Sequence, residues 1–153
     1  MGRPTRVLDT ETIISLQPLS TKCLACGNTA RVVYHTQRHV TTLQGHFCLS
    51  LIIRRCHQES CLRYHRPYRP EEEGQWTLPY GEYGLDVIAL VGMLRYRHHH
   101  SLAELHQALR DRGMILGERT VLNLLARYEE LASLHLSEKS HLQKIFANRT
   151  AAM

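Results

Sequence analysis

The sequence lacks the features of a membrane or secreted protein. Its longest apolar stretch, between Leu85 and Leu94, is too short to cross a bilayer and contains Asp86. The first residues include no apolar signal core. We therefore expect a cytoplasmic protein with no membrane segment. Its 153 residues, of which 43% are hydrophobic, are enough for a core in one domain or two small ones.

Lysine is scarce, because 16 of the 19 basic residues are arginine. The formal net charge of +5 is also uneven, since residues 1–70 carry a net +7 and residues 71–153 a net −2. An anionic partner is therefore expected to contact the first half. Arginine suits bidentate contact with phosphate and guanine, which favours double-stranded DNA as the partner. We expect no small-molecule substrate. A basic surface that only keeps the protein soluble is the alternative.

Four of the five cysteines form two pairs. Cys23 and Cys26, followed by Gly27, have the spacing of a metal-binding knuckle. After 29 intervening residues come Cys56 and Cys61, with the looser spacing C-x4-C. In a reducing compartment such pairs indicate a metal and not disulfides. A redox role for the first pair is disfavoured, because no βαβ pattern surrounds it.

Strand-forming segments separate the two cysteine pairs. We expect strands over residues 31–36, 40–43 and 46–55, with apolar residues alternating in the last segment and a hairpin turn at Gln44-Gly45. Strands that hold two cysteine pairs together are typical of a zinc ribbon. Four thiolates around a tetrahedral Zn²⁺ replace the core that so small a β-unit cannot build.

We expect one structural zinc ion per chain, with these ligands: Cys23, Cys26, Cys56 and Cys61. His57 is an alternative ligand and His65 a more remote one. Cys48 lies on the opposite strand face from its apolar neighbours and is expected to pack as a thiol that binds no metal. Four cysteines without any metal are the remaining alternative.

The ribbon is followed by a basic segment and then by an acidic one. Arg63, Arg66 and Arg69 alternate with tyrosines and prolines, which suits an extended segment along a phosphate backbone. A solvated linker is the alternative. The acidic run over residues 71–73 reverses the charge and marks a domain boundary. The apolar residues that follow it, from Trp76 onward, are expected to lead into the next unit.

The second half of the sequence is helical. Residues 83–97 are apolar all round, which predicts a central helix buried on two faces. We expect the two helices that follow to cover one face of this central helix. The ribbon, or a second copy of the chain in a homodimer through the helix between Leu85 and Leu94, covers the other. The three histidines at residues 98–100 are expected in a loop.

Residues 101–132 have the pattern of a helix-turn-helix. Ser101 and Glu104 form a capping box, and Gly113 ends the first helix. The second helix begins near residue 117 or 118. Helical spacing turns the following residues inward: Val121, Leu125, Tyr128 and Ala132. The same spacing places the residues expected to contact DNA on the polar face and its edge: Arg119, Thr120, Asn123 and Arg127. A purely structural helical hairpin is the alternative.

The predicted fold is therefore α+β, a small β-rich zinc ribbon followed by an all-helical helix-turn-helix unit. Its expected parts are a flexible lead over residues 1–20, a zinc-ribbon-like domain with a basic exit over 21–70, a linker over 71–82, a helix-turn-helix domain over 83–136 and a connector helix over 137–153.

The two cysteine pairs, the arginine-rich exit and the helices ending in Arg119-Thr120-Val121 resemble the N-terminal region of bacterial insertion-sequence transposases of the DDE class. The resemblance covers roughly residues 20–135. It implies a module that binds the terminal inverted repeats of a mobile element during DNA recombination. It also implies a nucleoid-associated protein in a prokaryotic cytoplasm.

The sequence departs from that family at catalysis. A DDE site needs three carboxylates on an RNase H fold to hold two Mg²⁺ ions. After Leu134 the chain contains only Glu138 and no strand pattern. We therefore expect no enzymatic activity, as in a truncated transposase or a protein that kept only the DNA-binding part. The main hypothesis is a zinc-stabilised, sequence-specific DNA-binding protein. A zinc-ribbon protein-interaction adaptor and a small transcriptional regulator are the alternatives.

Overall fold

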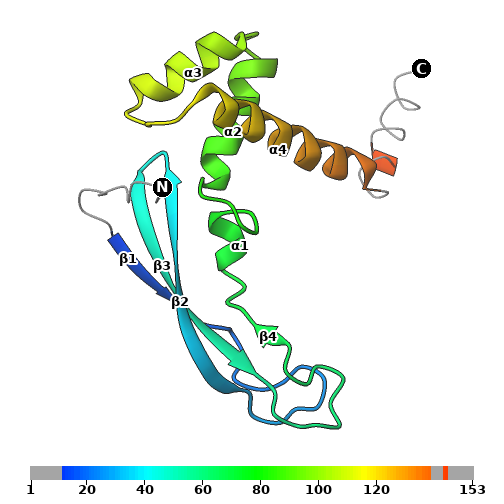
Figure 1. Ribbon diagram of the computed structural model, residues 1–153. Helices are drawn as coiled ribbons and strands as arrows, with labels where there is room; N and C mark the ends of the chain where they lie inside the picture. The colour runs from blue at the N-terminus through cyan, green and yellow to red at the C-terminus, as the bar shows by residue number, and fades with distance from the viewer. Residues whose placement is uncertain (1–11, 139–142, 145–153) are drawn as a thin grey trace. The chain divides into compact units, whose positions relative to one another are not determined.

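The computed structural model describes residues 12–138 and 143–144. Over these residues the fold is α+β, as predicted, with a four-stranded sheet and four helices (Figure 1). The chain divides after Leu85 into two compact units. We name the first the sheet unit and the second, from Asp86 onward, the helical unit. Within the described residues, no helix combines the length and apolar character needed to cross a membrane.

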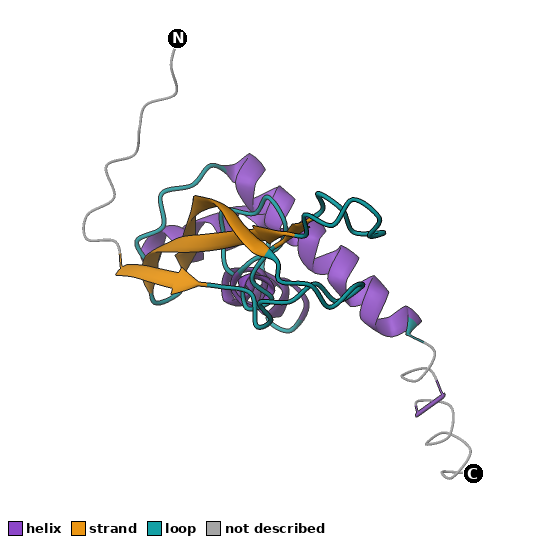
Figure 2. Cartoon of the chain, turned by 90° about the horizontal axis from the view of Figure 1, so that it is seen from below, coloured by secondary structure: helices purple, strands orange, loops and turns teal. Residues whose placement is uncertain are grey.

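The sheet unit is organised around one long antiparallel hairpin. Strands β2 (Arg31–Thr42) and β3 (Gly45–Arg55) pair along their whole length, with one irregularity between Val32 and Tyr34. β1 (Thr12–Leu16) pairs in parallel with the other edge of β3, so that three strands lie side by side (Figure 2). The two-residue strand β4 (Pro67–Tyr68) pairs with the end of β3.

One face of this sheet carries the core. The alternation predicted for residues 46–55 turns Leu49, Leu51 and Ile53 to the same side, where all three are fully buried. Leu16 and Val40 complete the cluster from the neighbouring strands. Trp76, at the end of the short helix α1 (Glu73–Trp76), packs against the same cluster and lies 5.1 Å from the Phe47 ring. Trp76 therefore closes the sheet core.

The structure of this unit differs from the sequence-based expectations in three places. Residues 31–36 and 40–43 are parts of one continuous strand, β2, because every residue between them also pairs with β3. The predicted flexible lead includes β1, whose pairing partner lies more than thirty residues away in the sequence. The expected linker over residues 71–82 is packed on the sheet, since the Thr41 N–H donates to the Glu82 carbonyl and the Gly84 N–H donates to the Thr41 carbonyl, both at 2.8 Å.

The helical unit contains α2 (Leu85–Tyr96), α3 (Leu102–Asp111) and α4 (Glu118–Ser137). The capping box is confirmed: the Ser101 N–H donates to the Glu104 carboxylate at 2.6 Å, and the Glu104 N–H donates to the Ser101 hydroxyl at 3.3 Å. Gly113 follows α3 with a φ of +84°, a conformation that other residues rarely adopt. The sequence therefore determines both ends of α3.

The predicted inward face of α4 is largely confirmed. Val121 and Leu125 are buried, and Tyr128 and Ala132 are half-buried. Leu124 is also buried, although it was not among the residues predicted to face inward. Ser137, expected to begin a connector helix, instead ends α4, and its hydroxyl donates to the Ser133 carbonyl. Of the rest of the connector, the structure describes only Glu138 and residues 143–144.

Half of the residues of helix α2 are buried, but Ala89, Met93 and Tyr96 are exposed along one side of the helix. Its buried residues are Val87, Ile88, Leu90, Val91, Gly92 and Leu94. Gly92 permits a close approach to α4, because a Cβ atom at this position would lie 2.2 Å from the Tyr128 ring. The three histidines after α2 lie in a loop, as expected. Homodimer formation through α2 stays a prediction.

Candidate metal centre and residues for DNA contact

The pairing of β2 with β3 brings the two cysteine pairs to one end of the sheet. Arg31, the first residue of β2, pairs with Arg55, the last residue of β3. The segment before β2 carries Cys23 and Cys26, and the segment after β3 carries Cys56 and Cys61, so the register of the hairpin places both segments together. Cys23, Cys56 and Cys61 pack with Ala30 and Tyr68 in a small separate cluster.

The four cysteine sulfurs have the geometry of a metal site. All four Sγ atoms lie within 4.8 Å of one another. The Cys23 and Cys61 sulfurs are 3.7 Å apart, and those of Cys26 and Cys56 are 3.5 Å apart, without a disulfide. In a tetrahedral zinc site with Zn–S distances of about 2.3 Å, neighbouring sulfurs lie about 3.8 Å apart. The predicted set of cysteines therefore fits a tetrahedral metal ion.

The backbone around the cysteines forms tight turns that hold the sulfurs in place. The Gly27 N–H donates to the Cys23 carbonyl at 2.9 Å, and Gly27 has a φ of +74°. In the second pair, the Cys61 N–H donates to the Gln58 carbonyl at 3.0 Å, and the Arg63 N–H donates to the Cys61 sulfur at 3.4 Å. The two turns differ in length, yet both direct their sulfurs to a common point.

Tyr68 is part of this centre, although the sequence placed it only in the extended basic segment. Its side chain is buried, and its hydroxyl lies 3.1 Å from the Cys23 sulfur and accepts a hydrogen bond from the Leu24 N–H at 3.1 Å. The guanidinium of Arg63 lies over the ring, 4.3 Å from its centroid. No spacing rule for metal ligands includes such a tyrosine, because it is not one of the candidate ligands.

The pKa values of Cys23 and Cys56 are shifted in opposite directions. The hydrogen bond with Tyr68, supported by backbone hydrogen bonds, lowers the pKa of Cys23 to about 6. For Cys56, a backbone hydrogen bond from Gln58 acts to lower the pKa, but burial and the three neighbouring cysteines outweigh it and raise the pKa to about 12. The metal-free cluster therefore retains protons that a metal ion must displace, and metal affinity should fall as the pH falls.

The alternative ligands lie outside the group of four sulfurs. His57 is exposed, and its Nδ1 lies 3.2 Å from the Arg55 carbonyl oxygen. The His65 ring lies 6.2 Å from the His57 ring, and neither belongs to the group. Cys48 is buried in the middle of β3, between Ile13 and His39 in register. The structure therefore favours the four-cysteine set.

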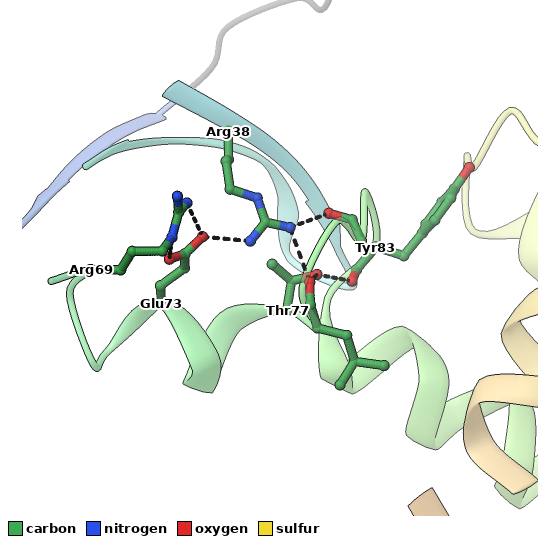
Figure 3. A network of polar contacts seen from close by, with 7 residues as sticks. Arg38, Arg69, Glu73, Thr77 and Tyr83 are labelled. Carbon is green, nitrogen blue, oxygen red and sulfur yellow. Dashed lines mark hydrogen bonds and ion pairs between the residues drawn. The ribbon is translucent and has the colours of Figure 1, made fainter. Parts of the chain in front are cut away.

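The three arginines of the basic exit have different surroundings. Arg66 is exposed. Arg63 covers Tyr68, and its Nε atom is buried without a hydrogen-bond partner. Arg69 forms a bidentate ion pair with Glu73, with both nitrogen–oxygen distances at 2.9 Å (Figure 3). Arg69 therefore has a structural partner that the sequence did not indicate.

Glu73 connects three segments of the sheet unit. Its carboxylate also pairs with Arg38 of β2, and the Arg38 guanidinium donates to the carbonyls of Leu78 and Gly81 (Figure 3). Only 10% of the Glu73 side chain is exposed. The hydrogen bond with Arg69 is the largest of the effects that lower the pKa of Glu73, and Arg38 adds to it. These contacts fix the segment after the basic exit onto the sheet.

The residues of α4 that are predicted to contact DNA lie within its first three turns. Arg119 and Asn123 are exposed, whereas Thr120 is half-buried. Arg127 is exposed and pairs with Glu130 at 2.6 Å on the same helix. Such exposed pairs are weak and open easily. The structure thus places Arg119 and Asn123 together on the surface, one helical turn apart.

Comparison with protein-family models, with curated proteins and with solved structures found no match to this chain.

Proposed function

We propose that this chain is a zinc-stabilised, sequence-specific DNA-binding protein without catalysis of its own. It combines a zinc ribbon, built on the β2–β3 hairpin, with a helix-turn-helix formed by α3 and α4. The observation that carries the proposal is the convergence of four cysteine sulfurs at a strongly basic end of the sheet. The resemblance to the terminal-repeat-binding region of a transposase agrees with this function.

The basic end of the sheet supports an anionic partner. Residues 21–66 contain seven arginines and lysines but only one acidic residue, Glu59. The hairpin register places Arg31, Arg54 and Arg55 next to the cysteines, in addition to the arginines of the basic exit. Because these like charges repel one another, a polyanion such as the DNA backbone would relieve the repulsion on binding.

The surface of α4 supports direct contact with bases. In a helix-turn-helix, the N-terminal residues of the second helix contact base edges in the major groove. Arg119 and Asn123 occupy this part of α4 and are exposed. Arginine pairs with guanine and asparagine with adenine through two hydrogen bonds each. We therefore assign base contacts to α4 and phosphate contacts to the sheet unit.

The chemistry of the sulfur cluster supports a structural zinc ion. Four thiolates complete a tetrahedral coordination shell and leave no open position for a substrate or an activated water. The test is metal analysis by mass spectrometry of protein purified without added metal. One zinc ion per chain is expected. Protein that is fully folded without any metal, or that carries iron, contradicts this assignment.

DNA binding is tested by fluorescence anisotropy with a labelled random duplex at several salt concentrations, followed by selection of preferred sequences from a random library. Affinity should fall steeply with salt, because each phosphate contact contributes a slope of about −0.9 in log K against log salt. Affinity that does not depend on salt, or a library without any enriched sequence, contradicts the proposal.

A protein-interaction adaptor is the second candidate. Its support is a group of exposed leucines on the last turns of α4: Leu131, Leu134 and Leu136, with 36%, 70% and 52% exposure. An adaptor needs no DNA affinity, so the anisotropy experiment separates the two functions.

A further inference from the structure

The side chain of Tyr68 has contacts that its packing alone does not require. Most of its residue surface is buried among Cys23, Ala30 and Cys56, and its hydroxyl has two polar partners. The Leu24 N–H donates to the phenolic oxygen at 3.1 Å. The hydroxyl hydrogen is therefore free to point to the second partner, the Cys23 sulfur, also at 3.1 Å.

The direction of the Tyr68–Cys23 hydrogen bond follows from the chemistry of a metal-bound sulfur. A cysteine that binds a metal does so as a thiolate and has no hydrogen to donate. In the metal-bound state only Tyr68 can be the donor. A hydrogen bond to a charged acceptor is stronger than one between neutral groups.

We propose that Tyr68 is an outer-shell residue of the metal centre, whose hydroxyl donates to the Cys23 thiolate and holds this ligand in its binding position. The inference rests on the proposed metal site. Partners of this kind orient a ligand and tune its donor strength, and their substitution typically reduces metal affinity about 10–100-fold.

Arg63 assists Tyr68 from the other side of the ring. Its guanidinium lies 4.3 Å from the ring centroid. The backbone N–H of Arg63 donates to the Cys61 sulfur at 3.4 Å. The main chain and the side chain of Arg63 thus contact two different parts of the same centre. A cation over the ring stabilises its position and makes the phenol a better donor.

The test uses Tyr68→Phe, which retains the ring and removes only the hydroxyl. Tyr64→Phe, four residues earlier in the chain and more exposed, is the matched control. We measure zinc affinity by competition with a chromophoric chelator, and the sulfur-to-metal charge-transfer absorption of the cobalt-substituted proteins. Tyr68→Phe should lower zinc affinity about 10–100-fold. It should also move the charge-transfer absorption to lower energy, since a thiolate without its hydrogen bond is a stronger electron donor.

The absorption shift separates positioning through Cys23 from a loss of packing, which would not change the donor strength of a sulfur. Arg63→Ala should reduce zinc affinity in the same direction but less, with Arg66→Ala as its control. If Tyr68→Phe has the affinity and absorption of the wild type, the inference is wrong. If the wild-type protein binds no metal, the proposed metal site fails as well, and the two failures are therefore distinct.

Discussion

The two units of this chain are stabilised in different ways. In the helical unit, leucine and valine side chains such as Leu105, Leu109 and Val121 are fully or almost fully buried. The end of the sheet that carries the cysteines has only a small cluster instead, in which Cys23, Cys56 and Tyr68 are the large members. Each buried leucine or valine contributes about 1.5–3 kcal/mol. The helical unit can therefore depend on its core alone, whereas we expect the cysteine end to depend on the proposed metal ion.

Removal of the proposed metal should produce the largest difference in stability between the two units. A structural zinc site contributes about 10–16 kcal/mol of apparent binding free energy at neutral pH. Cys56→Ser, or treatment with a chelator, should unfold the cysteine end and leave α2, α3 and α4 folded. Hydrogen exchange resolved by residue measures this difference. Cys48→Ser is the control and should keep the metal. If Cys48→Ser loses zinc and Cys61→Ser does not, the ligand assignment is wrong.

Glu73→Gln should show that the sheet unit also depends on an ion-pair network away from the metal. Replacement of the carboxylate by an amide leaves the largely buried Arg38 without an anionic partner, and the loss of one charge from a buried pair costs about 3–5 kcal/mol. Urea unfolding monitored by Trp76 fluorescence measures this cost. Glu72→Gln is the control, because Glu72 is exposed.

The effect of Glu73→Gln should also depend on pH. The folded-state pKa of Glu73 lies below its ordinary value of 4.5, so its contribution is complete above that pH. The contribution is lost as the pH falls through the lowered folded-state pKa. Wild type and variant should therefore differ most at neutral pH and converge in acid. A difference that is constant down to acid pH excludes the ion pair as its cause.

Gly92→Ala should destabilise the helical unit alone. The added methyl group would overlap the Tyr128 ring, and overpacking of a core costs about 1–3 kcal/mol. Thermal unfolding followed by circular dichroism should show a lower midpoint for the helical transition, with unchanged zinc content. At Gly74 a Cβ atom meets nothing within 4 Å, so Gly74→Ala is the control. Equal effects of the two variants contradict the close packing of α2 on α4.

The last prediction concerns the division of DNA contacts between the units. Arg119→Ala or Asn123→Ala should cost about 1–3 kcal/mol on the preferred sequence and reduce discrimination against random DNA. Arg66→Ala should weaken binding to all sequences alike and lower the salt slope by about one. Competition anisotropy with both kinds of duplex measures each effect. If Arg66 determines the sequence preference and Arg119 does not, the helix-turn-helix assignment is wrong.

The sequence predicted those features that depend on local spacing. The cysteine pairs, the alternation in β3, the capping box at Ser101 and the inward face of α4 each follow from residues a few positions apart. The structure bears out these local patterns. Zinc as the metal and DNA as the partner stay predictions, because no local pattern identifies the occupant of a site.

The features that the sequence did not predict depend on contacts between distant residues. Glu73 is one of three consecutive glutamates, and only the positions of Arg38 and Arg69 cause this one to be buried. The role of Tyr68 depends on Cys23, 45 residues earlier in the chain. β1 is a short segment whose strand conformation depends on an available edge of β3. In each case tertiary structure selects among residues that are equivalent in the sequence.

The parallel pairing of β1 with β3 has a consequence for the order of folding. β2 and β3 are joined by a tight turn and can form a hairpin within microseconds, whereas β1 must wait for an edge that is built from residues 47–51. The chain between β1 and β3 forms a long loop whose closure costs entropy. β1 should therefore join the sheet last during refolding. In the native protein it should also detach first, and its amides should exchange with solvent by local opening while the hairpin remains intact.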